Sequence, residues 1–189
     1  MTVRQSLLAI LAQGPCYGYQ LRAEFDRRTG AAWPLNVGQI YNTLERLERD
    51  GMVSKGDTDE QGHVYYAITD AGRADADRWF ALPLSPSGST RDELAAKIAL
   101  AATLPGVDVI ALVTAERDAA QDRLDRLREN PPPTGLAPAL VHDRLLANAV
   151  AEVGWLDQVS ARLTQHPEAE RVVAVSHLRP KRGRPARVA

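Results

Sequence analysis

Hydrophobic residues recur at two different spacings along residues 1–81 of the chain. Apolar positions three or four apart predict helices over 3–12, 17–28, 37–50 and 70–80, because that spacing gives each helix one buried face. Two short runs, 52–55 and 64–69, are β-like instead, and the polar segment GDTDEQGH with its two glycines lies between them. This arrangement predicts a β-hairpin. Asn36 and Thr69 are suited to cap the helices that follow them, and Gly51 is suited to end one.

Three helices, a hairpin and a further helix are the element order of a winged helix-turn-helix. The next stretch, LPLSPSGST (82–90), is rich in Pro, Ser and Gly and is typical of a linker. Helical periodicity then returns over 92–104, 107–129 and 138–165. We therefore predict a mainly α fold with a small β-hairpin. It comprises a winged helix-turn-helix domain (1–81), a linker (82–91), a helical dimerisation or effector domain (92–166) and a basic, disordered tail (167–189).

The two long amphipathic helices carry more apolar surface than the short helix over 92–104 can cover. Burial against a second copy of the same helices would resolve this excess, so we expect a homodimer. The alternative is a self-contained helical hairpin that closes on the N-terminal domain. The apolar stripe assigned to dimerisation is Val141, Leu145, Leu156, Val159 and Leu163.

Composition restricts the class of protein. A hydrophobic fraction of 44% and a charged fraction of 25% are typical of a globular protein, and no apolar run is long enough for a membrane span. The short apolar stretch over 7–12 lacks a cleavage site, so we expect a first helix and a cytoplasmic protein. The single cysteine, Cys16, excludes an internal disulfide framework. We interpret it as a small buried hydrophobe, with a redox sensor as the alternative.

The helix over 37–50 has the chemistry of a DNA-reading element. Ile40, Leu44 and Leu47 would face the core. The opposite stripe holds hydrogen-bonding side chains and no carboxylate, and such side chains can read base edges or thymine methyl groups in the major groove. The helix start presents free amides to a phosphate. The alternative is an ordinary solvated face, but the neighbouring elements favour DNA binding. The candidate residues are Asn36, Gly38, Gln39, Asn42, Thr43 and Arg46.

Three segments together resemble bacterial transcriptional regulators of the PadR type: GPCYGYQL (14–21), VGQIYNTLERLERDGMV (37–53) and VYYAITDAGR (64–73). The motif DELAAKIAL (92–100) resembles the longer-tailed branch of that family. The resemblance implies a winged-helix domain, a helical dimerisation domain and repression relieved by a small molecule. It also implies that Tyr19 and Tyr41 lie near the DNA backbone.

The predicted wing departs from the basic wings frequent in that family. Its loop carries Asp57, Asp59 and Glu60, whereas Lys55 and His63 are its candidate DNA contacts. Because phosphates repel carboxylates, we expect this wing to hold DNA weakly.

Positive charge gathers at the C-terminus. The whole chain has a net charge of −1, yet no Asp or Glu follows Glu170. The core Arg-Gly-Arg-Pro resembles an AT-hook, in which glycine lets the backbone lie deep in a narrow minor groove between inserted arginines. A generic electrostatic tail is the alternative. The candidate DNA contacts are Lys181, Arg182, Arg184 and Arg187.

Trp79 and Trp155 could stack a small aromatic or apolar inducer, or could simply be core residues. The histidines and Cys16 show no metal-ligand spacing, so we expect no metal and no cofactor. Without a phosphate loop or a nucleophile motif, we expect no enzyme. The predicted function is a DNA-binding regulator that recognises a pseudo-palindromic double-stranded operator as a homodimer. The rival is a winged-helix module that binds proteins without reading DNA.

Overall fold

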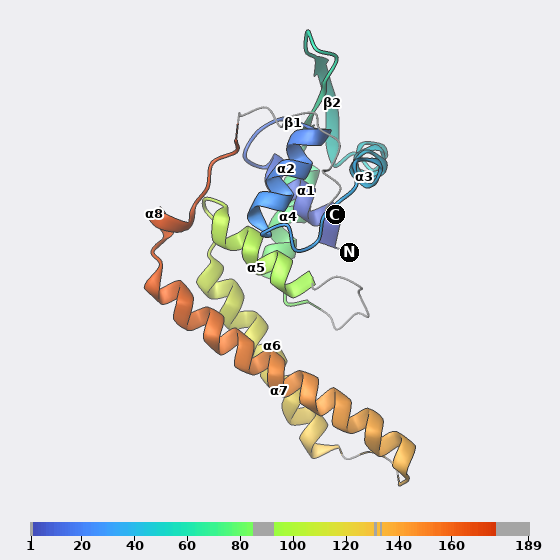
Figure 1. The fold of residues 1–189 in the computed structure, drawn as a ribbon, viewed down its shortest axis with the longest axis vertical. Coiled ribbons are helices and arrows are strands. Elements are labelled where there is room, and N and C mark those ends of the chain that lie inside the picture. The colour runs from blue at the N-terminus through green and yellow to red at the C-terminus, as the bar shows by residue number, and fades with distance from the viewer. Residues whose placement is uncertain (1, 85–92, 131, 133, 177–189) are drawn as a thin grey trace, which may run out of the picture.

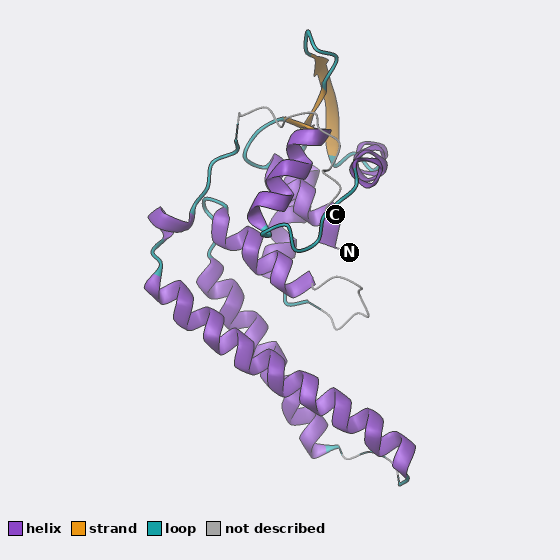
Figure 2. Ribbon diagram, viewed as in Figure 1, coloured by secondary structure: helices purple, strands orange, loops and turns teal. Residues whose placement is uncertain are grey.

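The computed structural model describes residues 2–84, 93–130, 132 and 134–176. Figure 1 shows a small sheet and α3 (Val37–Arg49) at one end of the molecule. Two long helices, α6 (Val109–Glu129) and α7 (Leu136–Gln165), extend side by side toward the other end. Helices account for most of the described residues (Figure 2), as the sequence predicts.

The N-terminal elements follow the predicted order. They are α1 (Thr2–Leu11), β1 (Cys16–Tyr17), α2 (Gly18–Arg28), α3, β2 (Val53–Thr58), β3 (Val64–Ile68) and α4 (Asp70–Ala81). The hairpin and the caps at Asn36 and Thr69 are confirmed.

The sheet contains a third strand that the sequence pattern does not reveal. Residue 17 was predicted to begin a helix, but Cys16 and Tyr17 pair antiparallel with Tyr66 and Tyr65 of β3, which gives the strand order β1-β3-β2. Two residues are too few to show strand periodicity, so only their pairing partner identifies them as a strand.

The first hydrophobic core surrounds α1. Its residues Leu7, Leu8 and Ile10 are fully buried, and so are Ile40 and the other two core positions predicted for α3, Leu44 and Leu47. Leu100 of α5 (Glu93–Thr103) is part of the same cluster. The helix after the linker therefore packs directly onto the winged-helix elements.

A second core lies along α6 and α7. The long helix predicted from Pro138 begins at Leu136, because a proline in the first turn removes an amide that has no intrahelical partner. Asp108 caps α6 by accepting a hydrogen bond from the Ala111 amide at 2.9 Å. The region predicted as a tail from residue 167 contains a helical turn, α8 (Glu168–Arg171), followed by an extended segment beside α2.

At Gly72, the backbone of α4 lies very close to the backbone of Met52, the residue before β2. A Cβ atom there would lie 2.1 Å from the Met52 carbonyl oxygen and 2.9 Å from Ile68 Cγ1. The backbone of residue 52 cannot yield easily, because its carbonyl also accepts the Thr69 amide at 3.1 Å. We expect Gly72→Ala to lower the free energy of unfolding by about 1–3 kcal/mol through overpacking. Chemical denaturation would measure this, with the exposed Ala71→Ser as the control expected to change little.

Cys16 is fully buried, as interpreted from the sequence. Burial raises the pKa of its thiol to about 12, and the Glu24 carboxylate adds to the rise while Arg28 opposes it. Because the thiolate is the reactive form, we expect Cys16 to resist thiol reagents at pH 8 until the protein unfolds. Ser54→Cys, at an exposed position of β2, supplies the fast-reacting control. Rapid labelling of native Cys16 would contradict the buried assignment.

Candidate nucleic-acid interface

The exposed face of α3 is the centre of the candidate interface. Figure 1 shows this helix at the molecular surface beside the β2–β3 hairpin. Asn42 and Arg46 are exposed on it, and neither side chain forms a hydrogen bond or ion pair within the part of the chain that the structure describes. Both side chains therefore keep their full hydrogen-bonding capacity for a base edge.

The start of α3 is fixed by a reciprocal cap. Asn36 Oδ1 accepts the Gln39 amide at 2.7 Å, and Gln39 Oε1 accepts the Asn36 amide at 3.3 Å. Gly38 is exposed in the same turn, where a Cβ would lie 3.4 Å from Asn36 Oδ1. This capping box makes the helix start rigid, but it also uses the side-chain oxygens of two candidate DNA contacts. Base reading by Gln39 would require its oxygen to leave the cap.

Thr43 uses its hydroxyl inside the helix. Its Oγ1 donates to the Gln39 carbonyl at 2.7 Å, a bond to the preceding turn that is common for threonine. The methyl group is then the part of Thr43 suited to recognition, and a thymine methyl is its natural contact.

Two tyrosines lie where α2 meets α3. Tyr41 packs over Gly18, where a Cβ atom would lie only 2.7 Å from Tyr41 Cζ. Burial raises the pKa of Tyr41, and nearby Tyr19 adds to the rise. Tyr19 is 41% exposed. The glycine at the start of α2 thus lets Tyr41 fill the helix junction while Tyr19 stays at the surface.

His63 turns toward the base of the wing. Its ring stacks on Tyr17 with centroids 4.5 Å apart, and its Nδ1 lies 2.9 Å from Asp59 Oδ2. Backbone amides of His63 and Gln61 also donate to Asp59, which lowers the pKa of that carboxyl. The imidazole therefore contacts Asp59 in the hairpin loop and Tyr17 of β1, and Asp59 stays ionised.

Lys55 is the exposed basic residue on β2, while Asp57 and Glu60 are exposed acids beyond it.

The negative charge around α3 is partly compensated by a residue of α1. Arg4 of α1 contacts the Asp50 carboxylate at 2.6 Å, and this hydrogen bond holds the pKa of Asp50 below its usual value. The ion pair leaves less uncompensated negative charge at the C-terminal end of α3.

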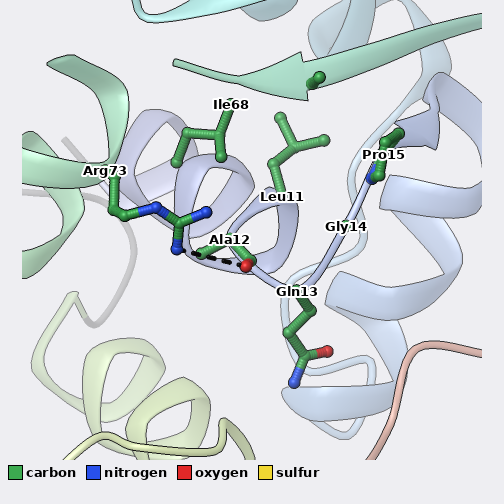
Figure 3. Close-up of a pocket in the computed structure, with 8 residues that line it drawn as sticks. Leu11, Ala12, Gln13, Gly14, Pro15, Ile68 and Arg73 are labelled. Atoms are coloured by element: carbon green, nitrogen blue, oxygen red, sulfur yellow. Dashed lines mark hydrogen bonds between the residues drawn. The ribbon is translucent and has the colours of Figure 1, made fainter. Parts of the chain in front are cut away.

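The two tryptophans suggested for inducer binding belong to packed clusters. Trp79 is in the first core and Trp155 packs partly buried against the second. Concave surfaces lie instead beside the turn that contains Gln13. A cavity of about 320 Å³ (Figure 3) is bounded by Leu11, Ile68 and Arg73, whose Nη1 donates to the Ala12 carbonyl at 3.4 Å.

A larger cavity, of about 530 Å³, lies beside the same turn. It is lined by Gln13, Gly14, Pro15, Pro105, Val172, Ala174 and Val175. Neither tryptophan lines either of the two cavities. Within the described ranges, no cluster of three or more His, Cys, Asp or Glu side chains is placed to hold a metal ion.

The residues assigned to dimerisation divide into two groups. Leu156 and Leu163 are buried in the second core, and Val159 packs partly buried against it. Val141 and Leu145 are 61% and 49% exposed.

The AT-hook candidates Lys181, Arg182, Arg184 and Arg187 lie outside the described residues.

Sequence reasoning missed one group of functional candidates. Gln20, Glu24, Arg27 and Arg28 of α2 hold the backbone of residues 173–176. Charged residues four apart on a helix are typical of a solvated face, so no local signal distinguishes them.

No helix in the part of the chain that the structure describes is long and apolar enough to cross a membrane.

A packed helical core, a β-hairpin wing and an exposed helix face beside it that carries Asn42 and Arg46 define a winged-helix DNA-binding protein. Residues 7–78 match the transcriptional regulator PadR-like family, and residues 90–164 match the family described as virulence activator alpha C-term. The probable transcriptional regulator Rv1176c of Mycobacterium tuberculosis is 30% identical, across 87% of this chain and 99% of its own length. The chain thus belongs to the PadR-like family and is a DNA-binding transcriptional regulator, not an enzyme.

A further relative comes from Bacillus subtilis. Its negative transcriptional regulator PadR is 21% identical, over 85% of this chain and 97% of its own length. The crystal structure of that organism's PadR in complex with operator DNA aligns with a TM-score of 0.41 and 20% identity. That alignment covers 85% of this chain and 97% of the other.

Proposed function

We propose that this protein is a cytoplasmic repressor that reads a pseudo-palindromic operator as a homodimer, with α3 in the major groove. The observation that carries the proposal is the exposed face of α3. Asn42 and Arg46 lie there without partners among the described residues, on a helix held rigid by its cap. A negative effect on transcription is supported by the name of the B. subtilis relative.

Support for the homodimer comes from α7. Leu136, Leu140, Val141, Leu145 and Val150 are large apolar side chains in its first half, and each is 48% exposed or more. Exposed apolar surface of this extent on one helix favours burial against a partner. A two-fold dimer would present two copies of α3 to half-sites about one helical turn of DNA apart. Val141 and Leu145 are the assigned residues best placed for such a contact.

Selection of bound duplexes from a random DNA pool tests base reading. We expect the wild-type chain to enrich a two-fold symmetric sequence. Asn42→Ala should relax the preference at one position in each half-site by about 1–3 kcal/mol, and Arg46→Ala should do so at another. Asn148→Ala makes the same chemical change on α7 and should leave the preference unchanged.

The outcomes separate the two candidate functions. An unchanged preference in both α3 variants would contradict base reading by this face. A protein that retains no duplex at low salt, while remaining folded, would favour the protein-interaction module.

We infer that a small apolar ligand relieves repression from the cavity of about 530 Å³. Its volume lies in the range of small-molecule sites, and its wall combines prolines and valines with the polar side chain of Gln13. A panel of flat aromatic compounds should include some that raise the Tm of the wild type and release DNA. Ala174→Phe, which narrows the cavity, should abolish this response, whereas Trp155→Phe should keep it. If Trp155→Phe abolishes the response and Ala174→Phe keeps it, the ligand binds beside Trp155 and not in this cavity.

A further inference from the structure

The chain returns to the winged-helix end of the molecule after its last helix. Residues 172–176, named here the C-terminal strap, follow α8 and run back alongside α2 (Figure 1). The Val173 amide donates to the Thr103 carbonyl at 3.0 Å, and Val175 packs against the first hydrophobic core. The strap is thus an integral part of the folded chain.

One face of α2 recognises the strap through its backbone. Residues 20, 24, 27 and 28 share this face, because they are spaced by about one or two helical turns. Gln20 Nε2 donates to the Ser176 carbonyl at 3.1 Å, and Glu24 Oε1 accepts the Ser176 amide at 2.9 Å. Arg27 donates to the Ala174 carbonyl at 2.8 Å, and Arg28 donates to the Val173 carbonyl at 2.9 Å.

Two of these α2 side chains are charged and buried. Glu24 is 1% exposed and Arg28 is 5% exposed, and they form an ion pair at 3.1 Å. Buried charges are costly unless hydrogen bonds satisfy their remaining donors and acceptors. The strap supplies such partners on both sides, as an amide for Glu24 and a carbonyl for Arg28. The buried pair and the strap therefore depend on each other.

The strap ends on α2, the helix that packs against α3. Ser176 is held by Gln20, which lies two residues after Gly18 and therefore faces a different side of α2 from the Gly18–Tyr41 junction with α3. Beyond it the sequence has no acidic residue, and its cations are Arg179, Lys181, Arg182, Arg184 and Arg187. An extended chain spans at most about 3.3–3.6 Å per residue, so Lys181 begins within roughly 18 Å of Ser176.

We propose that the strap is an intramolecular dock that holds the basic C-terminal residues against the same DNA molecule that α3 reads. The Arg-Gly-Arg sequence would enter an A·T-rich minor groove flanking the α3 contact, where negative potential is concentrated. A tether of this length gives the basic residues a high effective concentration at the DNA. The inference rests on the proposed DNA binding by α3.

Four proteins test the dock: the full chain, a chain lacking residues 178–189, the dock variant Gln20→Ala/Arg27→Ala, and the combination. The dock variant removes two strap contacts and also the Arg27–Glu24 ion pair at 2.6 Å, while both members of the buried Glu24–Arg28 pair remain. Hydrogen exchange at the Ser176 amide would report whether the strap has been released. Arg22→Ala removes a charge from α2 without touching the strap, since Arg22 pairs with Asp26.

Affinity and its salt dependence are measured on duplexes that carry the selected site between A·T-rich or G·C-rich flanks. We expect truncation to weaken binding by about tenfold or more at moderate salt and to reduce the salt slope by about 0.9 per lost phosphate contact. The loss should be larger with A·T-rich flanks. The dock variant should weaken binding several-fold in the full chain and should have no effect in the truncated chain.

Three results would overturn the proposal. Unchanged affinity after truncation would show that the basic residues do not contact DNA. If the dock variant lowers DNA affinity equally with and without residues 178–189, the strap only stabilises the fold. A dock variant with no effect, despite confirmed release of the strap, would show that positioning is unnecessary. If Gln20→Ala/Arg27→Ala fails to fold, Val175→Ser provides the second route to a loosened strap. Failure of the truncated chain to bind any duplex would instead contradict the proposed function of α3.

Discussion

Lys97→Met is expected to lower the free energy of unfolding by about 3–5 kcal/mol, because it leaves a buried carboxylate without its cation. Lys97 of α5 is fully buried, and its Nζ lies 2.7 Å from Glu116 Oε1 of α6 and 2.6 Å from the Leu82 carbonyl. The Leu84 amide donates to the same carboxylate at 3.0 Å. The pair thus joins both helices to the start of the linker. Chemical denaturation would measure the loss.

An exposed ion pair offers the matched control. Arg117 Nε lies 2.7 Å from Asp157 Oδ1, but both side chains are substantially exposed, so Arg117→Met should lower the stability far less than Lys97→Met. The double variant Lys97→Met/Glu116→Leu should recover much of the stability lost in Lys97→Met, because it removes both buried charges together. Equal losses of stability in Lys97→Met and Arg117→Met would contradict the conclusion that burial makes the Lys97–Glu116 pair the more important one.

Val141→Asp/Leu145→Asp is expected to convert the proposed homodimer to a monomer. Operator affinity should then fall by about 10²–10⁴-fold, because the second half-site contact loses its effective concentration. Both side chains are exposed within the single chain, so its own fold should be little affected. Sedimentation analysis and titration of a duplex carrying both half-sites would measure the two effects.

Leu82→Asp is the control for this experiment, because Leu82 is a comparably exposed leucine outside α7. It should leave both the mass and the affinity unchanged. A monomeric double variant with full operator affinity would contradict the need for a dimer. A double variant that stays dimeric would move the dimer contact away from these positions.

The elements predicted correctly are those whose signals are local. The buried face of α3 is defined by Ile40, Leu44 and Leu47, and its start is defined by an Asn–Gln pair three residues apart. These signals act within a few helical turns, where backbone geometry fixes which side chains meet. The amide, hydroxyl and guanidinium side chains on the opposite stripe were therefore enough to identify the candidate DNA-reading surface, which exposed Glu45 and Glu48 flank.

The contacts that escaped prediction join residues far apart in the chain. Gln20 and Ser176 are separated by 156 positions, and Lys97 meets Glu116 across two helices. Their charges look like solvated helix positions in a one-dimensional pattern. Similarly, β1 has two residues and becomes a strand only by pairing with β3. Burial of a charge, or pairing of a short strand, depends on which distant partner the fold brings to it.

Local patterning along the chain was sufficient to identify the winged helix, the helix that is the candidate for reading DNA, and the basic C-terminus. Packing decided how these parts are used. It committed Gln39 and Thr43 to hydrogen bonds within α3, turned His63 onto Tyr17, and placed the strap beside α2. Periodicity and capping depend on neighbours in sequence, whereas the availability of a side chain depends on all the atoms that surround it in space.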